Sequence, residues 1–572
     1  VNRIRSALSK MFRINRETFV RPSRLRRASV PILAVGFLAS AALSFSASSG
    51  SAARSRRSSV PGTLRPSSPR PSALSVGNFN PFSSLFDGLA SNIMPSSGGS
   101  VDQQEAFDAS SVPSWESIGG DLAAAQTPAE REFRGNLAKG LGSPSPLHDL
   151  RLYDASRFSE SDVRVTFYRD SASWCPYCQK VWLMLEEKGI PYRVERINMR
   201  CYGDKPRSFA RLQPSGAIPV ATIDGVTYRQ SNDIMYKLEE SFTEADGYRS
   251  VGWDAAEQDD ARRLLRLERG IFSAWMNWLT GGDYGGMARK SFIKALDEVE
   301  RELARNGGGF FVGGRPTIVD FMYASFLERM AASLLYFKGF RMRHDPAARA
   351  AGEASYPALN AWFDAMETLP SYRVTKSDYY THCWDLPPQL GGCVPEKGGA
   401  PFTAAINGER RLDGTGGSWD LPLQPHNGGA EPDWDWCGDD VAARREAVER
   451  LSFNHKAIVR FAARGAGKAG IPGVMAPLSD PGATPDGTVG PAVDGALRAV
   501  CAALLAGEGT AARHVVEAAT VVRGGGKEHA DAVVRSLAYL RDRVGVPRDM
   551  RLPAARQLRA YLNLVIGEII KD

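Results

Sequence analysis

The stretch that most constrains this chain runs from Val163 to Gly189 and places two cysteines between an expected strand and an expected helix. Alternating apolar residues at its start predict a half-buried strand, and apolar residues at helical spacing follow the sequence Trp-Cys-Pro-Tyr-Cys. Pro176 fits the first helical position, because the N–H that proline lacks has no partner there. Cys175 is therefore expected at the N-cap, where free backbone N–H groups and the helix dipole stabilise a thiolate. Cys178, one turn later, lies within reach of Cys175, which favours redox chemistry of the thiols.

Two other interpretations of the cysteine pair carry less weight. A zinc site needs a second pair of ligands at compatible spacing, and the next cysteine, Cys201, stands alone, so we expect no metal here. Two inert, half-buried cysteines are the remaining alternative. The strand–C-P-Y-C–helix context makes that alternative less frequent than it would be for an isolated C-x-x-C.

The basic character of the chain belongs to its beginning. The whole chain carries a net charge of +7, but residues 1–75 hold 14 Lys and Arg against the single acid Glu17, a surplus of 13 that leaves −6 for the rest. The folded part is therefore not expected to bind nucleic acid. Seven cysteines, odd in number and scattered, do not form a disulfide framework and favour a reducing compartment.

Residues 1–75 are predicted to be a targeting presequence. Basic residues precede the apolar run Val30–Phe45, which is shorter than the about 20 residues of a membrane-spanning helix and fits a signal h-region. The acid-free, Ser- and Arg-rich stretch after it resembles the two-part plastid presequence of algae with complex plastids. We therefore predict a plastid location, with Met11 as a candidate start and no membrane contact after processing. Secretion, or membrane anchoring through residues 30–45, is the alternative.

Regular strand and helix patterns continue after the cysteine stretch. Tyr192–Asn198 predicts a second strand, and Gly216–Tyr228 predicts two strands joined by the turn signal Asp224-Gly225. Pro219 cannot donate to a sheet ladder, so we expect an edge position or a special peptide geometry. Gln230-Ser231 then leads into a helix with Ser231 as the expected N-cap, which presents free N–H groups to an anion.

The order of these motifs resembles the thioredoxin-fold half of the glutathione S-transferase superfamily, on its cysteine-type side with the omega, dehydroascorbate-reductase and glutaredoxin-like proteins. The resemblance implies a cis bond before Pro219 and backbone pairing of Ile218 with the cysteinyl part of glutathione. It also implies that Gln230 and Ser231 hold the γ-glutamyl carboxylate. Most relatives have Glu at the first of these two positions, so Gln230 keeps a hydrogen-bonding side chain but loses the charge. Tyr177 and Lys180 are expected to shape or polarise the same glutathione site.

A helical second half is expected next. Thr317 and Asp320 have the spacing of a capping box and match a cap that the family carries in a core helix. Trp275 and Trp278 could line an acceptor pocket, but core packing is commoner for such residues. The predicted fold class is an α/β thioredoxin-fold half, an all-α glutathione-transferase half and an additional helical extension. The predicted parts are a presequence (1–75), a linker or disordered segment (76–160), a thioredoxin-like glutathione-binding domain (161–243), a helical transferase domain (254–385), a linker (386–439) and a helical extension of unknown role (440–572).

The resemblance implies an enzyme, a glutathione-dependent thiol transferase or reductase acting in deglutathionylation or dehydroascorbate-type reduction. Cys175 would form a mixed disulfide with glutathione, the co-substrate, and Cys178 could resolve it. The expected partners are glutathione and a small electrophilic or disulfide substrate, and a homodimer is compatible with the family. The alternative is a non-catalytic scaffold that binds glutathione or senses redox state, which the long C-terminal part would suit. Membrane insertion is the weakest idea, since only the leader holds a long apolar run.

Overall fold

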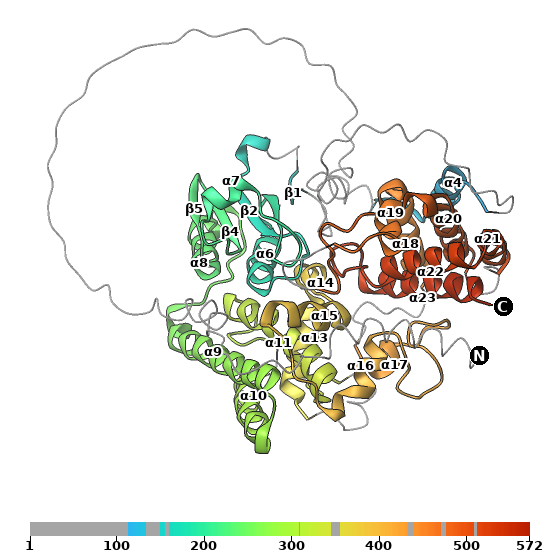
Figure 1. Cartoon of the computed structure of the whole chain (residues 1–572). Coiled ribbons are helices and arrows are strands. Elements are labelled where there is room, and N and C mark those ends of the chain that lie inside the picture. The colour runs from blue at the N-terminus through green and yellow to red at the C-terminus, as the bar shows by residue number, and fades with distance from the viewer. Residues whose placement is uncertain are drawn as a thin grey trace, which may run out of the picture. The chain divides into compact units, whose positions relative to one another are not determined.

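The computed structural model describes residues 112–132, 149–154, 159–307, 309–344, 355–432, 440–470, 476–507 and 512–571. The predicted presequence at 1–75, with Met11 and the apolar run Val30–Phe45, lies outside the described residues. Figure 1 labels the helices and strands along the chain.

The first half is built on a five-stranded mixed sheet in the order β1-β3-β2-β4-β5. The central strand β2 pairs in parallel with β3, and the helix α6 connects these two strands along the chain. On its other side β2 pairs antiparallel with β4. The β4–β5 turn falls at Asp224-Gly225, and both residues have positive φ, as the turn signal predicted. The strands are β1 (Leu150–Arg151), β2 (Val165–Asp170), β3 (Tyr192–Ile197), β4 (Val220–Ile223) and β5 (Val226–Tyr228).

Three helices accompany the sheet, namely α6 (Pro176–Lys188), α7 (Arg207–Leu212) and α8 (Ser231–Ser241). The apolar residues of α6 and α8 pack in one core with the buried face of β2 (Figure 1). Val165 and Phe167 alternate with less buried neighbours along β2, because successive strand side chains point to opposite faces. This arrangement confirms the predicted thioredoxin-like half. In it, the first residue of α6 follows shortly after the last residue of β2.

The second half is helical, as predicted, and α11 lies at its centre with every residue buried. The capping box at the start of α11 is present: Thr317 N and Oγ1 both donate to Asp320 Oδ2 at 2.9 Å. Trp275 and Trp278 are buried in this core, where their indole N–H groups donate to Ser333 and Glu396. The helices are α9 (Gln258–Gly281), α10 (Met287–Arg305), α11 (Ile318–Lys338), α13 (Pro357–Thr368), α14 (Pro370–Thr375) and α15 (Tyr379–Leu390).

The described part of the segment 386–439, predicted to be a linker, packs on the second half. It contains α16 (Ala400–Ile406) and the short α17 (His426–Gly429), and Ile406 and Trp419 are buried in the same core as α11. Trp419 lies so close to Gly408 that a Cβ at Gly408 would meet its ring. A Gly-rich composition therefore hid a packed connection, because glycine here permits close contact as well as flexibility.

The C-terminal helices form a bundle with a second apolar core of their own. The predicted linker at 76–160 contributes to it, since α4 (Trp115–Ala125) buries Ile118 and Leu122 there and Trp115 Nε1 donates to Asp494 Oδ1 at 2.8 Å. The bundle helices are α18 (Val441–Phe453), α19 (His455–Ala462), α20 (Gly490–Ala506), α21 (Ala512–Gly524), α22 (Lys527–Arg541) and α23 (Leu552–Ile569).

One stretch of the bundle, Gly487–Ala506, is long and apolar enough to cross a membrane by length and composition, and is the one such stretch among the described residues. The sequence predicts no such run outside residues 30–45. However, 67% of its apolar window is buried, and α20 packs against α18, α21 and α23. The stretch is therefore placed as the core helix of the bundle.

Candidate active site

Cys175 occupies the N-cap of α6 and Pro176 the first helical position, as the sequence predicted. The buried side chain of Asp170, the last residue of β2, fixes the loop between strand and helix. Its Oδ2 accepts hydrogen bonds from the backbone N–H of Trp174 at 2.5 Å and of Cys175 at 3.0 Å. The end of a central strand thus sets the position of the cysteine backbone.

The two cysteines of the C-P-Y-C sequence differ in their surroundings. Both are free thiols; Cys175 keeps 8% of its surface exposed and Cys178 only 1%. Burial raises the pKa of Cys178 well above its usual range, and the adjacent Cys175 thiol raises it further. Cys178 is therefore protonated at neutral pH, whereas Cys175 stands at the positive end of the helix.

Tyr177 and Lys180 lie on α6 beside the cysteines. Tyr177 is half-buried with its ring edge against Phe326, and burial raises the pKa of its phenol. Lys180 is buried, and its Nζ donates to Asn232 Oδ1 at 2.6 Å in the first turn of α8. Burial lowers the pKa of Lys180 to about 8, so its ammonium form predominates at neutral pH. Lys180 thereby joins the cysteine helix to the start of α8.

The remaining predicted residues lie at the starts of β4 and α8. The Ile218–Pro219 bond is cis and immediately precedes β4, which pairs antiparallel with residues 165–168 of β2. At α8 the N-cap is Gln230, which is exposed, and not Ser231, which is the buried first helical residue. The prediction was one residue late, because Gln is a less frequent N-cap than Ser. The free N–H groups of the helix still begin at this point.

Two charged residues near the cysteines, Arg169 and Asp170, were not predicted as part of the site from the sequence. Besides Asp170, the buried Arg169 donates from Nη1 to the Asp170 carbonyl at 2.9 Å and to Ser173 Oγ at 2.8 Å. Its guanidinium also lies 4.3 Å from the centre of a Trp182 ring. The adjacent Arg169-Asp170 pair at the end of an apolar strand was the available signal, since charged residues are seldom fully buried without partners.

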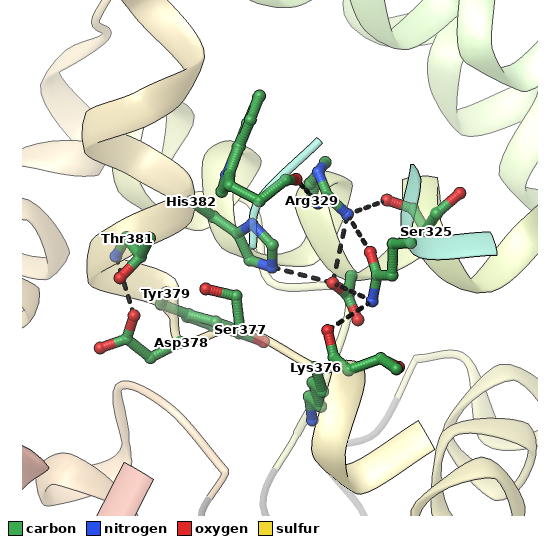
Figure 2. Close-up of polar contacts among 12 residues, drawn as sticks. Ser325, Arg329, Lys376, Ser377, Asp378, Tyr379, Thr381 and His382 are labelled. Carbon is green, nitrogen blue, oxygen red and sulfur yellow. Dashed lines mark hydrogen bonds and ion pairs between the residues drawn. The ribbon is translucent and has the colours of Figure 1, made fainter. Parts of the chain in front are cut away.

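A third missed residue, Arg329, reaches the site from α11 in the helical half (Figure 2). Its Nη2 donates to the carbonyl oxygen of Trp174, the residue before Cys175. Its Nη1 donates to Gln179 Oε1 at 2.6 Å. No local sequence pattern reveals these contacts, because about 150 residues separate Arg329 from both partners.

Comparison with known proteins identifies the two halves. A family model described as the glutathione S-transferase N-terminal domain matches residues 174–241, and one described as the C-terminal domain matches residues 255–365. The glutathione S-transferase DHAR2 of Arabidopsis thaliana is 30% identical over 166 residues, which are 29% of this chain and 71% of that protein. The chain belongs to the glutathione S-transferase family.

Other relatives match the same region. The pyrimidodiazepine synthase of Drosophila melanogaster is 28% identical over 242 residues, 41% of this chain and 85% of that protein. The structure of glutathione transferase Omega 3C from Trametes versicolor covers 38% of this chain and 90% of its own, at 23% identity and a TM-score of 0.31. Each of these matches leaves more than half of this glutathione S-transferase chain uncovered.

Proposed function

We propose that this glutathione S-transferase is a glutathione-dependent thiol transferase or reductase whose Cys175 forms a mixed disulfide with glutathione. The observation that carries the proposal is the contrast within C-P-Y-C. Both thiols are buried, but Cys175 stands at the N-cap of α6 and keeps 8% of its surface exposed, while Cys178 keeps 1% and has a raised pKa. A thiolate is the nucleophile in disulfide chemistry, and a helix N-terminus favours it.

Glutathione would lie between the starts of β4 and α8. The backbone of Ile218, beside the cis Pro219, would pair with the cysteinyl part, and Gln230 and Ser231 would hold the γ-glutamyl carboxylate. The free N–H groups at the start of α8 suit an anion. The Lys180 ammonium, 2.6 Å from Asn232 in the same helical turn, adds a positive charge beside them. Tyr177 would cover the cysteine side of the ligand.

The reaction would proceed in two exchange steps. The Cys175 thiolate attacks the glutathione sulfur of a mixed disulfide; the Cys175–glutathione bond forms as the old S–S bond breaks, and the substrate leaves as a thiol after taking up a proton. The thiolate of a second glutathione then attacks that glutathione sulfur, which releases glutathione disulfide and restores the Cys175 thiolate. Reduction of dehydroascorbate would consume two glutathiones in the same way, with two electrons and two protons passing to the substrate.

The test is turnover of a small glutathione mixed disulfide, and of dehydroascorbate, by the wild-type chain and single variants. Cys175→Ser is expected to abolish turnover, because a serine hydroxyl forms no disulfide. Cys178→Ser should retain at least a third of it, because the second glutathione resolves the intermediate. Cys393→Ser, a half-buried thiol on the second half, is the control. Full turnover in Cys175→Ser would refute the proposal, and retention on immobilised glutathione without any turnover would favour the scaffold alternative.

We also propose that residues 1–75 direct the chain to a plastid. The acid-free, Ser- and Arg-rich stretch behind a short apolar run supports this. A fluorescent protein fused behind residues 1–75 should accumulate in the plastids of an alga with complex plastids, and accumulation in the secretory pathway would contradict it. A homodimer is proposed from the family alone, and light scattering on the purified chain tests it.

A further inference from the structure

We infer that Arg329 is a positioning residue of the cysteine site. From the helical half it holds the backbone carbonyl before Cys175 and the Gln179 side chain one turn after it, and it supplies a buried positive charge there. The inference rests on the proposed thiol chemistry of Cys175. It assigns a part in that chemistry to a residue outside the thioredoxin-like half.

The contacts of one guanidinium carry the inference. Nη2 donates to the Trp174 carbonyl, immediately before Cys175, and Nη1 donates to Gln179 Oε1, one turn into α6. The guanidinium carbon also lies 5.0 Å from the centre of a Trp174 ring. Arg329 thus holds the residue before the nucleophile and the helical turn after it. A planar guanidinium suits this role, because its donors are fixed in a fork.

The guanidinium is itself held by a buried polar group on α11 and α15 (Figure 2). The Ser325 carbonyl accepts from Nη1, and Glu328 Oε1 lies 3.2 Å from the same nitrogen. Gln179 Nε2 donates to that glutamate oxygen at 2.8 Å, and His382 Nε2 lies 3.1 Å from it. Only 1% of Arg329 is exposed. Its position is therefore set by packing, as a positioning residue requires.

The charges of this group follow from its surroundings. Burial lowers the pKa of His382, and Arg329 lowers it further, so the imidazole is neutral. Burial would raise the pKa of Glu328, but His382, Arg329 and Lys376 together lower it, so Glu328 is an anion. Arg329 keeps its charge, because guanidinium does not deprotonate in proteins. The cation next to the Trp174 carbonyl and the anion behind it should act on a Cys175 thiolate in opposite directions.

Other groups act on Cys175 from neighbouring elements and stay unchanged in the test. Groups that interact electrostatically with it, or hold its N–H, include Asp170 of β2, Tyr177, Cys178 and Lys180 of α6, Lys205 after β3, and Arg329 of α11. Single substitutions of Arg329 and Glu328 leave all the others in place.

The test is the rate at which iodoacetamide alkylates Cys175 of the full chain, followed by peptide mass spectrometry from about pH 5 to pH 10. Arg329→Gln is expected to raise the midpoint of the pH profile by about one unit, a roughly tenfold slower reaction below both midpoints. Arg329→Lys should recover part of the shift, since it restores the charge without the fork. Glu328→Gln should lower the midpoint, because it removes the opposing charge.

The matched control is Arg343→Gln. Arg343 is likewise a buried guanidinium, paired with Glu367 and lying 4.8 Å from the Phe363 ring. The Arg343→Gln variant should be less stable than the wild type, but the midpoint of its Cys175 alkylation profile should not move. An unchanged midpoint in Arg329→Gln, or an equal shift in Arg343→Gln, would overturn the inference. If Arg329→Gln fails to fold, Glu328→Gln decides, since a midpoint that rises or stays unchanged overturns it as well.

Alkylation needs neither glutathione nor turnover, so this result is separate from that of the Cys175→Ser assay. A shifted midpoint together with full turnover in Cys175→Ser would uphold the role of Arg329 toward the thiol and refute the proposed reaction. An unshifted midpoint with turnover lost in Cys175→Ser would do the reverse.

Discussion

Asp385 of α15 should make the stability of this protein depend on pH. It has no exposed surface, and its carboxyl accepts a hydrogen bond from Tyr202 OH at 3.0 Å, across the two halves of the transferase. Burial raises the pKa of Asp385 to about 7, although Tyr202 and Arg548 partly oppose the shift. We expect Asp385→Asn to stabilise the fold at alkaline pH relative to the wild type.

The sign and size follow from proton linkage. The folded pKa of about 7 exceeds the ordinary value of 3.8, so the folded state holds this proton more tightly than the unfolded state. The resulting stabilisation is complete below pH 3.8 and is lost as the pH rises through about 7. About three pH units at about 1.4 kcal/mol each amount to about 4 kcal/mol in total. Between about pH 5.5 and pH 8.5 the loss is about 2 kcal/mol.

Urea unfolding followed by far-UV circular dichroism measures this. The free energy of unfolding of Asp385→Asn minus that of the wild type should increase by about 2 kcal/mol from about pH 5.5 to pH 8.5. Asp224→Asn is the control: the half-exposed Asp224 pairs with Arg164 at 2.6 Å, and the Arg164 hydrogen bond lowers the pKa of Asp224. Asp224 is ionised in both the folded and the unfolded state over this range, so the free-energy difference between Asp224→Asn and the wild type should not change with pH and should stay below about 1 kcal/mol. A difference for Asp385→Asn that is flat with pH would refute the reasoning.

Three further substitutions test other contacts. Arg559→Met should cost about 3–5 kcal/mol in urea unfolding, because it leaves Asp378, 2.8 Å away and buried, without its cation; a loss below about 1 kcal/mol would contradict this. Thr317→Ala should cost about 1–2 kcal/mol through loss of the α11 cap, and an unchanged midpoint of denaturation would count against that cap. Lys180→Met should raise the stability by about 1–3 kcal/mol at pH values below 8, because a buried ammonium is removed, and should slow alkylation of Cys175. Equal stability of Lys180→Met and wild type at neutral pH would show that the ammonium is not desolvated.

Local rules made the start of the site predictable. Pro176 after Cys175 placed the cysteine at the N-cap, and the spacing of Thr317 and Asp320 placed the start of α11. Both depend on residues within one helical turn. The N-cap of α8 was missed by a single residue, at Gln230, because backbone geometry and not side-chain preference sets it there.

Contacts between distant segments were not predictable. Ile118 and Leu122 of α4 complete a core formed more than 300 residues later in the chain. With Trp115 they have helical spacing, but one short helix does not reveal which distant segment covers its apolar face. The burial of Trp419 in the core of the second half was likewise not predictable, because it lies in the segment predicted to be a linker. The contact of Arg329 with the cysteine loop could not be predicted from the sequence. Because every residue of α11 is buried, the pattern of the helix does not indicate which neighbouring segment the arginine faces.

The C-terminal extension is joined to the transferase by buried polar contacts that lead toward the cysteine site. Arg559 of α23 pairs with Asp378, whose other carboxylate oxygen caps α15 by accepting from Thr381 N at 2.9 Å. The next residue of that helix, His382, contacts Glu328, which lies beside Arg329, and Arg329 holds the loop before Cys175 (Figure 2). Each member of this series is buried. The extension therefore stabilises the capped end of the helix that carries His382, through the ion pair between Arg559 and Asp378.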